Sequence, residues 1–128
     1  MAMFMVLDPA QYDVIVSNNL FGDILTDLGA AIQGGLGLAA SGNIHPGRVS
    51  LFEPVHGSAP PLAGKGVANP IGAILTSAMM LEYLGHPEAG KAIEASVRGA
   101  VLDNETTRDL GGGLSTKQAG DAILRRLS

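Results

Sequence analysis

The sequence contains no cysteine and no tryptophan, and aromatic residues make up only 4% of it. Without cysteine the chain can form no disulfide, no thiolate metal site and no cysteine nucleophile. With so few aromatic rings it lacks the stacking surfaces on which proteins bind single-stranded nucleic acid. Its eight Lys and Arg form no long cluster and the formal net charge is −4, so the basic surface of a nucleic-acid binder is missing. We therefore expect no nucleic-acid partner.

Long hydrophobic runs are also absent. Gly, Asn or Asp interrupts each apolar stretch before it reaches membrane-spanning length. The apolar opening, residues 1–7, is too short for a signal peptide and has no basic flank. The hydrophobic content of 46% and charged content of 16% are typical of a globular chain, and 128 residues suffice for one modest core. These features predict a soluble, cytoplasmic protein without a membrane partner.

Glycine is abundant, with 18 residues, and eleven of them are concentrated in 34–47, 57–66 and 111–113. Such clusters between periodic segments indicate loops whose backbone approaches something closely. Residues 35–40 formally match the dinucleotide fingerprint G-x-G-x-x-A, but they follow a predicted helix and no long helix comes after them, so their context rejects the match. Gly64-Lys65-Gly66 is likewise no P-loop, because Gly66 stands where Ser or Thr is required.

Hydrophobic periodicity predicts an α/β chain that is rich in helix and has few strands. Strands are expected at Tyr12–Ser17, Leu36–Ile44 and Val49–Phe52. Helices are expected from Asn18 or Asn19 to about Gln33, from Asn69-Pro70 to Gly85, from His86-Pro87 onward, and from the capping-box pattern Ser115–Gln118 to about Leu127. Residues 53–69 show no periodicity, and a loop of that length in a compact domain is usually functional or disordered.

Asp23 and Asp27 lie four residues apart in the first predicted long helix, so their side chains share one face. Two carboxylates this close repel each other unless a cation lies between them, and a hard divalent cation suits oxygen ligands. The alternative is that both are ordinary acids near a helix N-terminus, where they complement the helix dipole. Spacing alone leaves both interpretations open. Asn19, one further step of four away, extends the polar stripe and favours a site.

Several long motifs resemble those of the β-decarboxylating dehydrogenases in order and spacing. They are Asn19-Leu-Phe-Gly-Asp-Ile-Leu-Thr-Asp27, Gly34–Ile44, Leu51-Phe-Glu-Pro-Val-His-Gly-Ser-Ala-Pro60, Ala63–Pro70, Ala73–Leu81 and Thr107–Gly112. That family includes 3-isopropylmalate, isocitrate, homoisocitrate and tartrate/D-malate dehydrogenases. The resemblance covers nearly the whole chain and is closest to the 3-isopropylmalate dehydrogenases of leucine biosynthesis.

The resemblance implies the isopropylmalate dehydrogenase-like α/β fold, which is not a Rossmann fold, present here in part. Residues 1–35 would form the end of the smaller domain, which carries the dimer contact and metal site. Residues 36–128 would form the returning C-terminal half of the larger, cofactor-binding domain. The implied protein is a homodimeric, metal-dependent enzyme that oxidises and decarboxylates a small 2-hydroxy acid with NAD, NADP not being excluded.

The resemblance also implies site residues. Asp23 and Asp27 would be two of three acidic ligands of Mg²⁺ or Mn²⁺ and would act in catalysis through that metal. Glu53 would lie near the nicotinamide. The loop that would cradle the adenosine half of the cofactor comprises His56, Gly57, Ser58, Ala59, Pro60, Leu62, Ala63, Gly64, Lys65, Gly66, Val67, Ala68 and Asn69. Asn69 has a second interpretation as the N-cap of the next helix.

The chain departs from the family pattern in two ways. Pro61 stands where NAD-using members usually carry an Asp that holds the ribose hydroxyls, and no basic residue replaces that Asp. The third acidic ligand, the substrate-binding arginines and the Lys and Tyr of the acid–base steps would lie upstream of this chain. We therefore expect a C-terminal fragment that is inactive alone. A nucleotide-binding module without catalysis and a structural oligomerisation piece are the alternatives.

Overall fold

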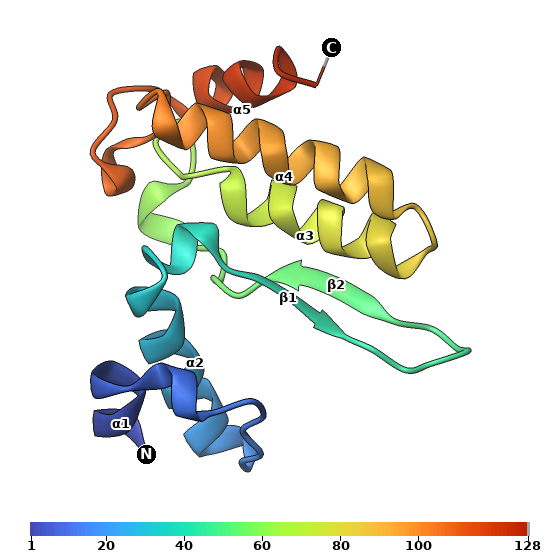
Figure 1. The fold of residues 1–128 in the computed structure, drawn as a ribbon. Helices are drawn as coiled ribbons and strands as arrows, with labels where there is room; N and C mark the ends of the chain where they lie inside the picture. Colours follow the sequence, from blue (N-terminus) through green and yellow to red (C-terminus); the bar gives the residue numbers. More distant parts are fainter. Residues whose placement is uncertain (128) are drawn as a thin grey trace.

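The computed structural model describes residues 1–127, which form five α-helices and two short strands (Figure 1). The helices are α1 (Ala2–Leu7), α2 (Asn19–Ile32), α3 (Ile71–Tyr83), α4 (Pro87–Leu102) and α5 (Thr116–Leu124), and the strands are β1 (Ala40–Asn43) and β2 (Leu51–Pro54). Single 3₁₀ turns lie at Pro9–Gln11, Leu36–Leu38, Pro60–Leu62 and Arg108–Leu110. The expected α/β pattern, rich in helix with few strands, describes this part of the chain.

The elements from β1 onward are stacked in layers, with α1 and α2 below them (Figure 1). Strands β1 and β2 pair antiparallel, with Ala40 opposite Pro54 and Asn43 opposite Leu51. Helix α3 packs on this hairpin, α4 packs on α3, and α5 packs on α4. The 3₁₀ turn at Leu36–Leu38 contacts both α2 and α3, so it connects the lower helices to the layered part.

The core lies among α3, α4 and α5. Ile71, Val97, Ala100 and Ile123 form its buried cluster. Small residues allow the helices to approach closely: a Cβ added to Gly90 of α4 would lie 3.1 Å from the carbonyl oxygen of Ala78 in α3. A core built from so few large side chains leaves little of this fold's stability to hydrophobic burial.

Most helix boundaries agree with the sequence-based expectations. The Asn18 side chain accepts a hydrogen bond from the Phe21 amide and so caps α2, and Gly34 follows its end at a φ of 114°. The capping box of Ser115 and Gln118 is present at the start of α5. The Asn69 side chain accepts from the Ile71 amide at 2.9 Å, so Asn69 caps the first turn of α3 although Pro70 directly precedes the helix.

Three strand predictions need correction. Tyr12–Ser17 is not a strand: Val14 is 80% exposed and Val16 is 90% exposed, and no described strand pairs with this segment. The predicted strand Leu36–Ile44 shortens to Ala40–Asn43 because its start turns as a 3₁₀ helix. The predicted strand Val49–Phe52 lies instead at Leu51–Pro54, which moves Glu53 from the loop into β2. A strand requires a neighbouring strand to bond its backbone N–H and C=O groups. The hydrophobic pattern of a segment does not indicate whether such a neighbour is present.

The N-terminal third of the chain exposes many large apolar side chains. They include Met1, Met3, Phe4, Val6, Leu7, Leu20, Phe21 and Ile24, each at least 45% exposed. Surface of this kind on two neighbouring helices is more than a monomeric protein ordinarily leaves in water. None of the described helices has the length and apolarity needed to cross a membrane.

Candidate functional site

Helix α2 displays Asn19, Asp23 and Asp27 as one exposed polar stripe. The Asn19 amide nitrogen donates a hydrogen bond to Asp23 Oδ2 at 3.1 Å, which restricts the orientation of that carboxylate. Helix α2 begins at Asn19, and its first turn contains no acidic residue. The helix-dipole effect falls off within the first turn. Position in the helix therefore gives Asp23 and Asp27 little stabilisation from the dipole, and the helix-dipole interpretation loses its main support.

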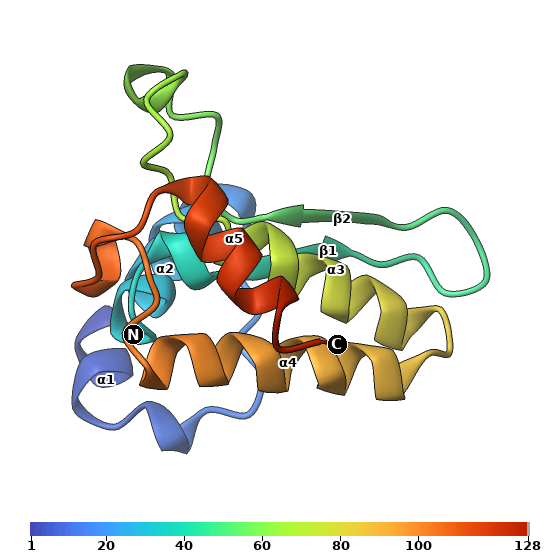
Figure 2. The same cartoon turned by 90° about the horizontal axis from the view of Figure 1, so that it is seen from above.

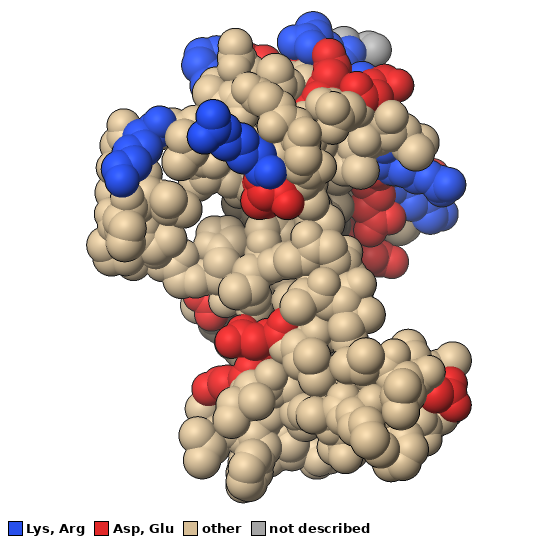
Figure 3. Space-filling model, turned by 90° about the vertical axis from the view of Figure 1, so that its left-hand side faces the viewer, with Lys and Arg blue, Asp and Glu red and all other residues tan. Residues whose placement is uncertain are grey.

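The charge distribution around α2 favours a cation. Residues 1–35 contain four acids, Asp8, Asp13, Asp23 and Asp27, and no Lys or Arg. The remaining sequence has eight acids and eight Lys and Arg, so the formal net charge of −4 belongs to this segment. In Figure 3 the lower part of the visible face, which α1 and α2 form, shows acidic groups but no basic ones. A negative field of this kind attracts divalent cations.

The residues present fit part of a metal site. Among residues 1–127, no group of three or more His, Asp or Glu side chains is arranged to hold a metal ion. Asp23 and Asp27 are therefore two carboxylate donors on one helix face, without a third acid beside them. Mg²⁺ usually retains several waters and needs only one or two protein carboxylates together with substrate oxygens. The pair is thus chemically suited to such an ion once further oxygen ligands are supplied.

The loop from His56 to Asn69 projects from the layered part of the molecule between β2 and α3 (Figure 2). Its backbone is left-handed at Ala59 (φ 41°), Gly64 (φ 73°) and Gly66 (φ 62°). No atom lies within 4 Å of the Cβ that could be added to Gly57, Gly64 or Gly66. A ligand can therefore approach the backbone of this loop closely, which is the geometry that a glycine-rich cofactor loop requires.

Glu53 is the one predicted cofactor residue outside this loop, which it precedes in the chain. Glu53 is exposed on β2, and its carbonyl oxygen accepts a hydrogen bond from the Ser41 hydroxyl at 2.8 Å. The half-buried His56 ring has Nδ1 3.0 Å from the Gly57 carbonyl oxygen. Pro61 sits in the exposed 3₁₀ turn Pro60–Leu62. Within residues 1–127, no hydrogen bond or ion pair joins the loop to Asp23 or Asp27.

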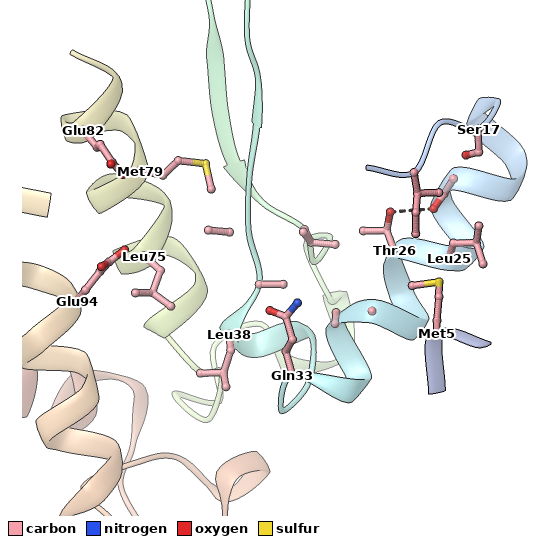
Figure 4. A pocket seen from close by; sticks show the side chains of 17 residues that line it. Met5, Ser17, Leu25, Thr26, Gln33, Leu38, Leu75, Met79, Glu82 and Glu94 are labelled. Atoms are coloured by element: carbon pink, nitrogen blue, oxygen red, sulfur yellow. Dashed lines mark hydrogen bonds between the residues drawn. The ribbon is translucent and has the colours of Figure 1, made fainter. Parts of the chain in front are cut away.

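Helix α2 also borders a groove of about 560 Å³, which separates it from α3 and β1 (Figure 4). Its lining combines apolar side chains, such as those of Met5, Leu25 and Met79, with the carboxylates of Glu82 and Glu94. Neither aspartate and no residue of the predicted cofactor loop lines it. On a helical projection its α2 lining faces roughly 90° away from the Asn19–Asp27 stripe. The groove is therefore a neighbour of the polar stripe and not the site itself.

Sequence reasoning missed three residues that bear on the loop. Asp109 Oδ2 accepts a hydrogen bond from the Asn69 amide nitrogen at 2.8 Å, and the Thr107 hydroxyl donates to Asp109 Oδ1 at 2.6 Å. Thr116 donates from its backbone to the Gly66 carbonyl oxygen and from its hydroxyl to the Ala68 carbonyl oxygen. Thr107 and Asp109 belong to a motif that supported the resemblance, but forty residues separate Asp109 from its partner, so no local pattern predicts the contact.

The profile of the family described as isocitrate/isopropylmalate dehydrogenase matches residues 1–123. The chain belongs to this family. A homoisocitrate dehydrogenase of Methanocaldococcus jannaschii is 51% identical over 96% of this chain and 35% of its own length. A 3-isopropylmalate dehydrogenase of Clavibacter sepedonicus is 55% identical over 98% of this chain and 36% of its own length. The chain thus spans little more than a third of these curated relatives.

Solved structures of the isocitrate/isopropylmalate dehydrogenase family share this fold. An isocitrate dehydrogenase from Methylococcus capsulatus aligns with a TM-score of 0.93 at 48% identity, over 98% of this chain and 38% of the other. A β-decarboxylating dehydrogenase from Thermococcus kodakarensis aligns with a TM-score of 0.85 at 49% identity, over 98% of this chain and 37% of the other. These matches confirm the expected family and its partial α/β fold. The family is one of oxidative decarboxylating dehydrogenases, and the names of its relatives cover several substrates.

Proposed function

We propose that this chain supplies two metal ligands and the cofactor loop of a β-decarboxylating dehydrogenase that oxidises a small 2-hydroxy acid. The observation that carries the proposal is the position of Asp23 and Asp27 on one exposed face of α2, beyond its first turn. A purely structural role explains this position poorly, because neither the dipole nor any ion pair with a described residue accounts for it. Membership of the family supplies the second support.

The chain's own residues would bind and orient the reactants. Asp23 and Asp27 would hold a divalent cation, and Asn19 would fix the direction of the Asp23 carboxylate through its hydrogen bond. The open backbone of the loop from His56 to Asn69 would receive the dinucleotide, and Glu53 would lie towards its nicotinamide end. When bound, the metal supplies Lewis acidity at the substrate oxygens and the nicotinamide supplies a hydride acceptor.

The substrate is proposed as 3-isopropylmalate, with homoisocitrate or isocitrate as the next candidates. The first choice rests on the resemblance to 3-isopropylmalate dehydrogenases, including the one from Clavibacter sepedonicus. The others are kept because an isocitrate/homoisocitrate dehydrogenase of Thermus thermophilus is 52% identical. The residues that choose among these acids would lie in the part of the relatives that this chain does not span. The family resemblance also implies that the assembled enzyme would be a homodimer. The contact between its two subunits would cover the exposed apolar residues of α1 and α2.

A chimera tests the proposed chemistry directly. The matching segment of the Thermus thermophilus isocitrate/homoisocitrate dehydrogenase is replaced by these 128 residues, and reduction of NAD or NADP is followed with that enzyme's substrates and Mn²⁺. We expect metal-dependent turnover, because the chain would restore two metal ligands and the loop. The isolated chain should show none. A second chimera with the corresponding segment of the Methanocaldococcus jannaschii relative is the control. If that control is active while the first chimera is folded and inactive, the proposal fails.

Pro61 leads to a prediction about the choice of cofactor. In the active chimera, Pro61→Asp should lower KM for NAD about tenfold, because a carboxylate that accepts hydrogen bonds from ribose hydroxyls contributes more than a neutral acceptor does. Steady-state kinetics with NAD and NADP measure the effect. Pro61→Ala serves as the control, since it removes the proline ring without adding a carboxylate. Equal KM values for the Asp and Ala variants would show that position 61 does not contact the ribose.

Nucleotide binding without catalysis is the second candidate function. It is favoured by the fact that Asp109 and Thr116 of this chain hold the end of the loop from His56 to Asn69, whereas the metal pair lacks a third acid among the described residues. An active chimera would argue against this candidate. An inactive chimera together with dinucleotide binding by the isolated chain would favour it.

A further inference from the structure

The middle of the loop between β2 and α3 makes few contacts that could define its shape. Every residue from Gly57 to Ala68 is exposed. Its few backbone hydrogen bonds are local, such as Leu62 N–H to the Ala59 carbonyl oxygen at 2.8 Å and Lys65 N–H to the Leu62 carbonyl oxygen at 3.1 Å. A segment with no buried side chains and only local hydrogen bonds opens at low free-energy cost. Its shape therefore depends on how its two ends are held.

The outgoing end is held by the sheet, because the Val55 amide donates to the Ala39 carbonyl oxygen at 3.1 Å. The returning end is held by Thr116 at the start of α5. Its amide donates to the Gly66 carbonyl oxygen at 2.8 Å, and its hydroxyl donates to the Ala68 carbonyl oxygen at 2.6 Å. Thr116 alone thus donates hydrogen bonds to two carbonyl groups in the returning half of the loop, and these carbonyls lie two residues apart in the sequence.

Asp109 holds the last loop residue from the other side. Its Oδ2 accepts from Asn69 Nδ2 at 2.8 Å, while its Oδ1 is fixed by the hydroxyl of Thr107, which is itself fully buried. The Asn69 Oδ1 meanwhile accepts from the Ile71 amide at 2.9 Å. Both ends of the Asn69 amide group are therefore engaged, and its rotation is blocked.

The same contact point reaches towards α2, the helix that carries the two proposed metal ligands. Gly37 lies in the 3₁₀ turn between α2 and β1. A Cβ at Gly37 would lie 2.8 Å from Asp109 Oδ2 and 3.0 Å from the Asn69 side chain. Only glycine permits this approach without moving the Asp109–Asn69 pair. The turn after α2, the end of the loop and residues 107–109 therefore meet at one place.

We propose that Asp109 and Thr116 are positioning residues that fix Gly66–Asn69 and so keep the loop in one shape before a dinucleotide binds. The role in binding rests on the proposed function, whereas the restraint on the loop does not. A loop ordered in advance loses less conformational entropy on binding, so the restraint appears as affinity. Neither side chain needs to touch the cofactor.

Pairs of substitutions that keep or remove the hydrogen bonds test whether these bonds position the loop. Asp109→Asn can keep both hydrogen bonds, because its Oδ1 can accept from Asn69 while its Nδ2 donates to the Thr107 hydroxyl, which accepts as well as donates. Asp109→Ala removes both. Thr116→Val removes the hydroxyl at nearly constant side-chain volume, whereas Thr116→Ser keeps the hydroxyl. Asp121→Ala is the matched control, since Asp121 is a partly exposed acid on α5 that pairs with Lys117.

Amide hydrogen exchange on the full 128-residue chain provides the first measurement. Asp109→Ala and Thr116→Val should speed exchange of the Leu62, Ala63 and Lys65 amides about tenfold, the factor that loss of a typical hydrogen bond produces in a local opening equilibrium. Exchange in the core of α4, at Val97 and Ala100, should not change. Asp109→Asn, Thr116→Ser and Asp121→Ala should match the parent. Unchanged loop exchange in the Ala and Val variants, or an equal rise throughout the chain, would overturn the proposal.

Titration with NAD, followed by the chemical shifts of the loop amides, provides the second measurement. If the parent binds, the Ala and Val variants should bind several-fold more weakly and the Asn and Ser variants as tightly as the parent. Equal affinity for all variants would overturn the positioning role. If the parent does not bind NAD but the exchange pattern holds, the restraint on the loop is supported and the failure belongs to the proposed function.

Discussion

Asp23→Asn in the active chimera is expected to lower kcat by at least roughly a hundredfold and to weaken Mn²⁺ binding in parallel, since loss of a ligand should exceed the effect of losing a supporting hydrogen bond. The amide that replaces the carboxylate keeps the volume and can still accept from Asn19, so the helix should stay folded. The substitution removes one of the two negative charges that Asp23 and Asp27 expose on the same helix face. Metal titrations of turnover and Mn²⁺ electron paramagnetic resonance measure the two effects.

Asp13→Asn is the matched control for this substitution. Asp13 is another exposed acid in the same segment, but it lies before α2 and outside the polar stripe. It shares the general negative field without sharing the predicted site, so its replacement should change Mn²⁺ affinity only slightly. Similar small effects for Asp23→Asn and Asp13→Asn would mean that the segment attracts cations generally and that Asp23 is not a ligand.

Gly112→Ala is expected to destabilise the isolated chain by about 3 kcal/mol, the upper range for forcing extra atoms into a packed site. A Cβ at Gly112 would overlap the backbone carbonyl group and the hydroxyl of Thr106. Thr106 is only 1% exposed and its carbonyl oxygen accepts from the Leu114 amide, so this backbone cannot move away without losing buried contacts. Urea denaturation of parent and variant measures the difference.

Gly113→Ala provides the comparison for Gly112→Ala. No atom lies within 4 Å of a Cβ added at Gly113, so the same change one residue later should have a small effect on the free energy of unfolding. Comparable losses at both positions would indicate that both changes act through backbone flexibility. In that case the close approach of residues 106 and 112 would not explain the effect.

Helix positions were predictable because their signals are local. Asn18 before α2, Asn69 before α3 and the Ser115–Gln118 box before α5 each place a side-chain acceptor beside amides that a helix leaves unpaired. The relation between Asp23 and Asp27 is also local, since spacing by four puts two side chains on one helix face. The strands were less predictable. Tyr12–Ser17 has the apolar pattern of a strand, but without a pairing strand its backbone remains irregular and its valines exposed.

The sequence by itself determined the family, the helices from α2 onward and the two aspartates as a pair, because each follows from residues close together along the chain or from motifs in a fixed order, whereas α1 was not predicted. Only the tertiary structure showed that the aspartates lie beyond the first turn of an exposed helix with no third acid beside them among residues 1–127. It alone also revealed that Asp109 and Thr116 hold the end of the cofactor loop. Contacts between residues forty or more positions apart depend on how helices pack, and no local periodicity encodes that packing.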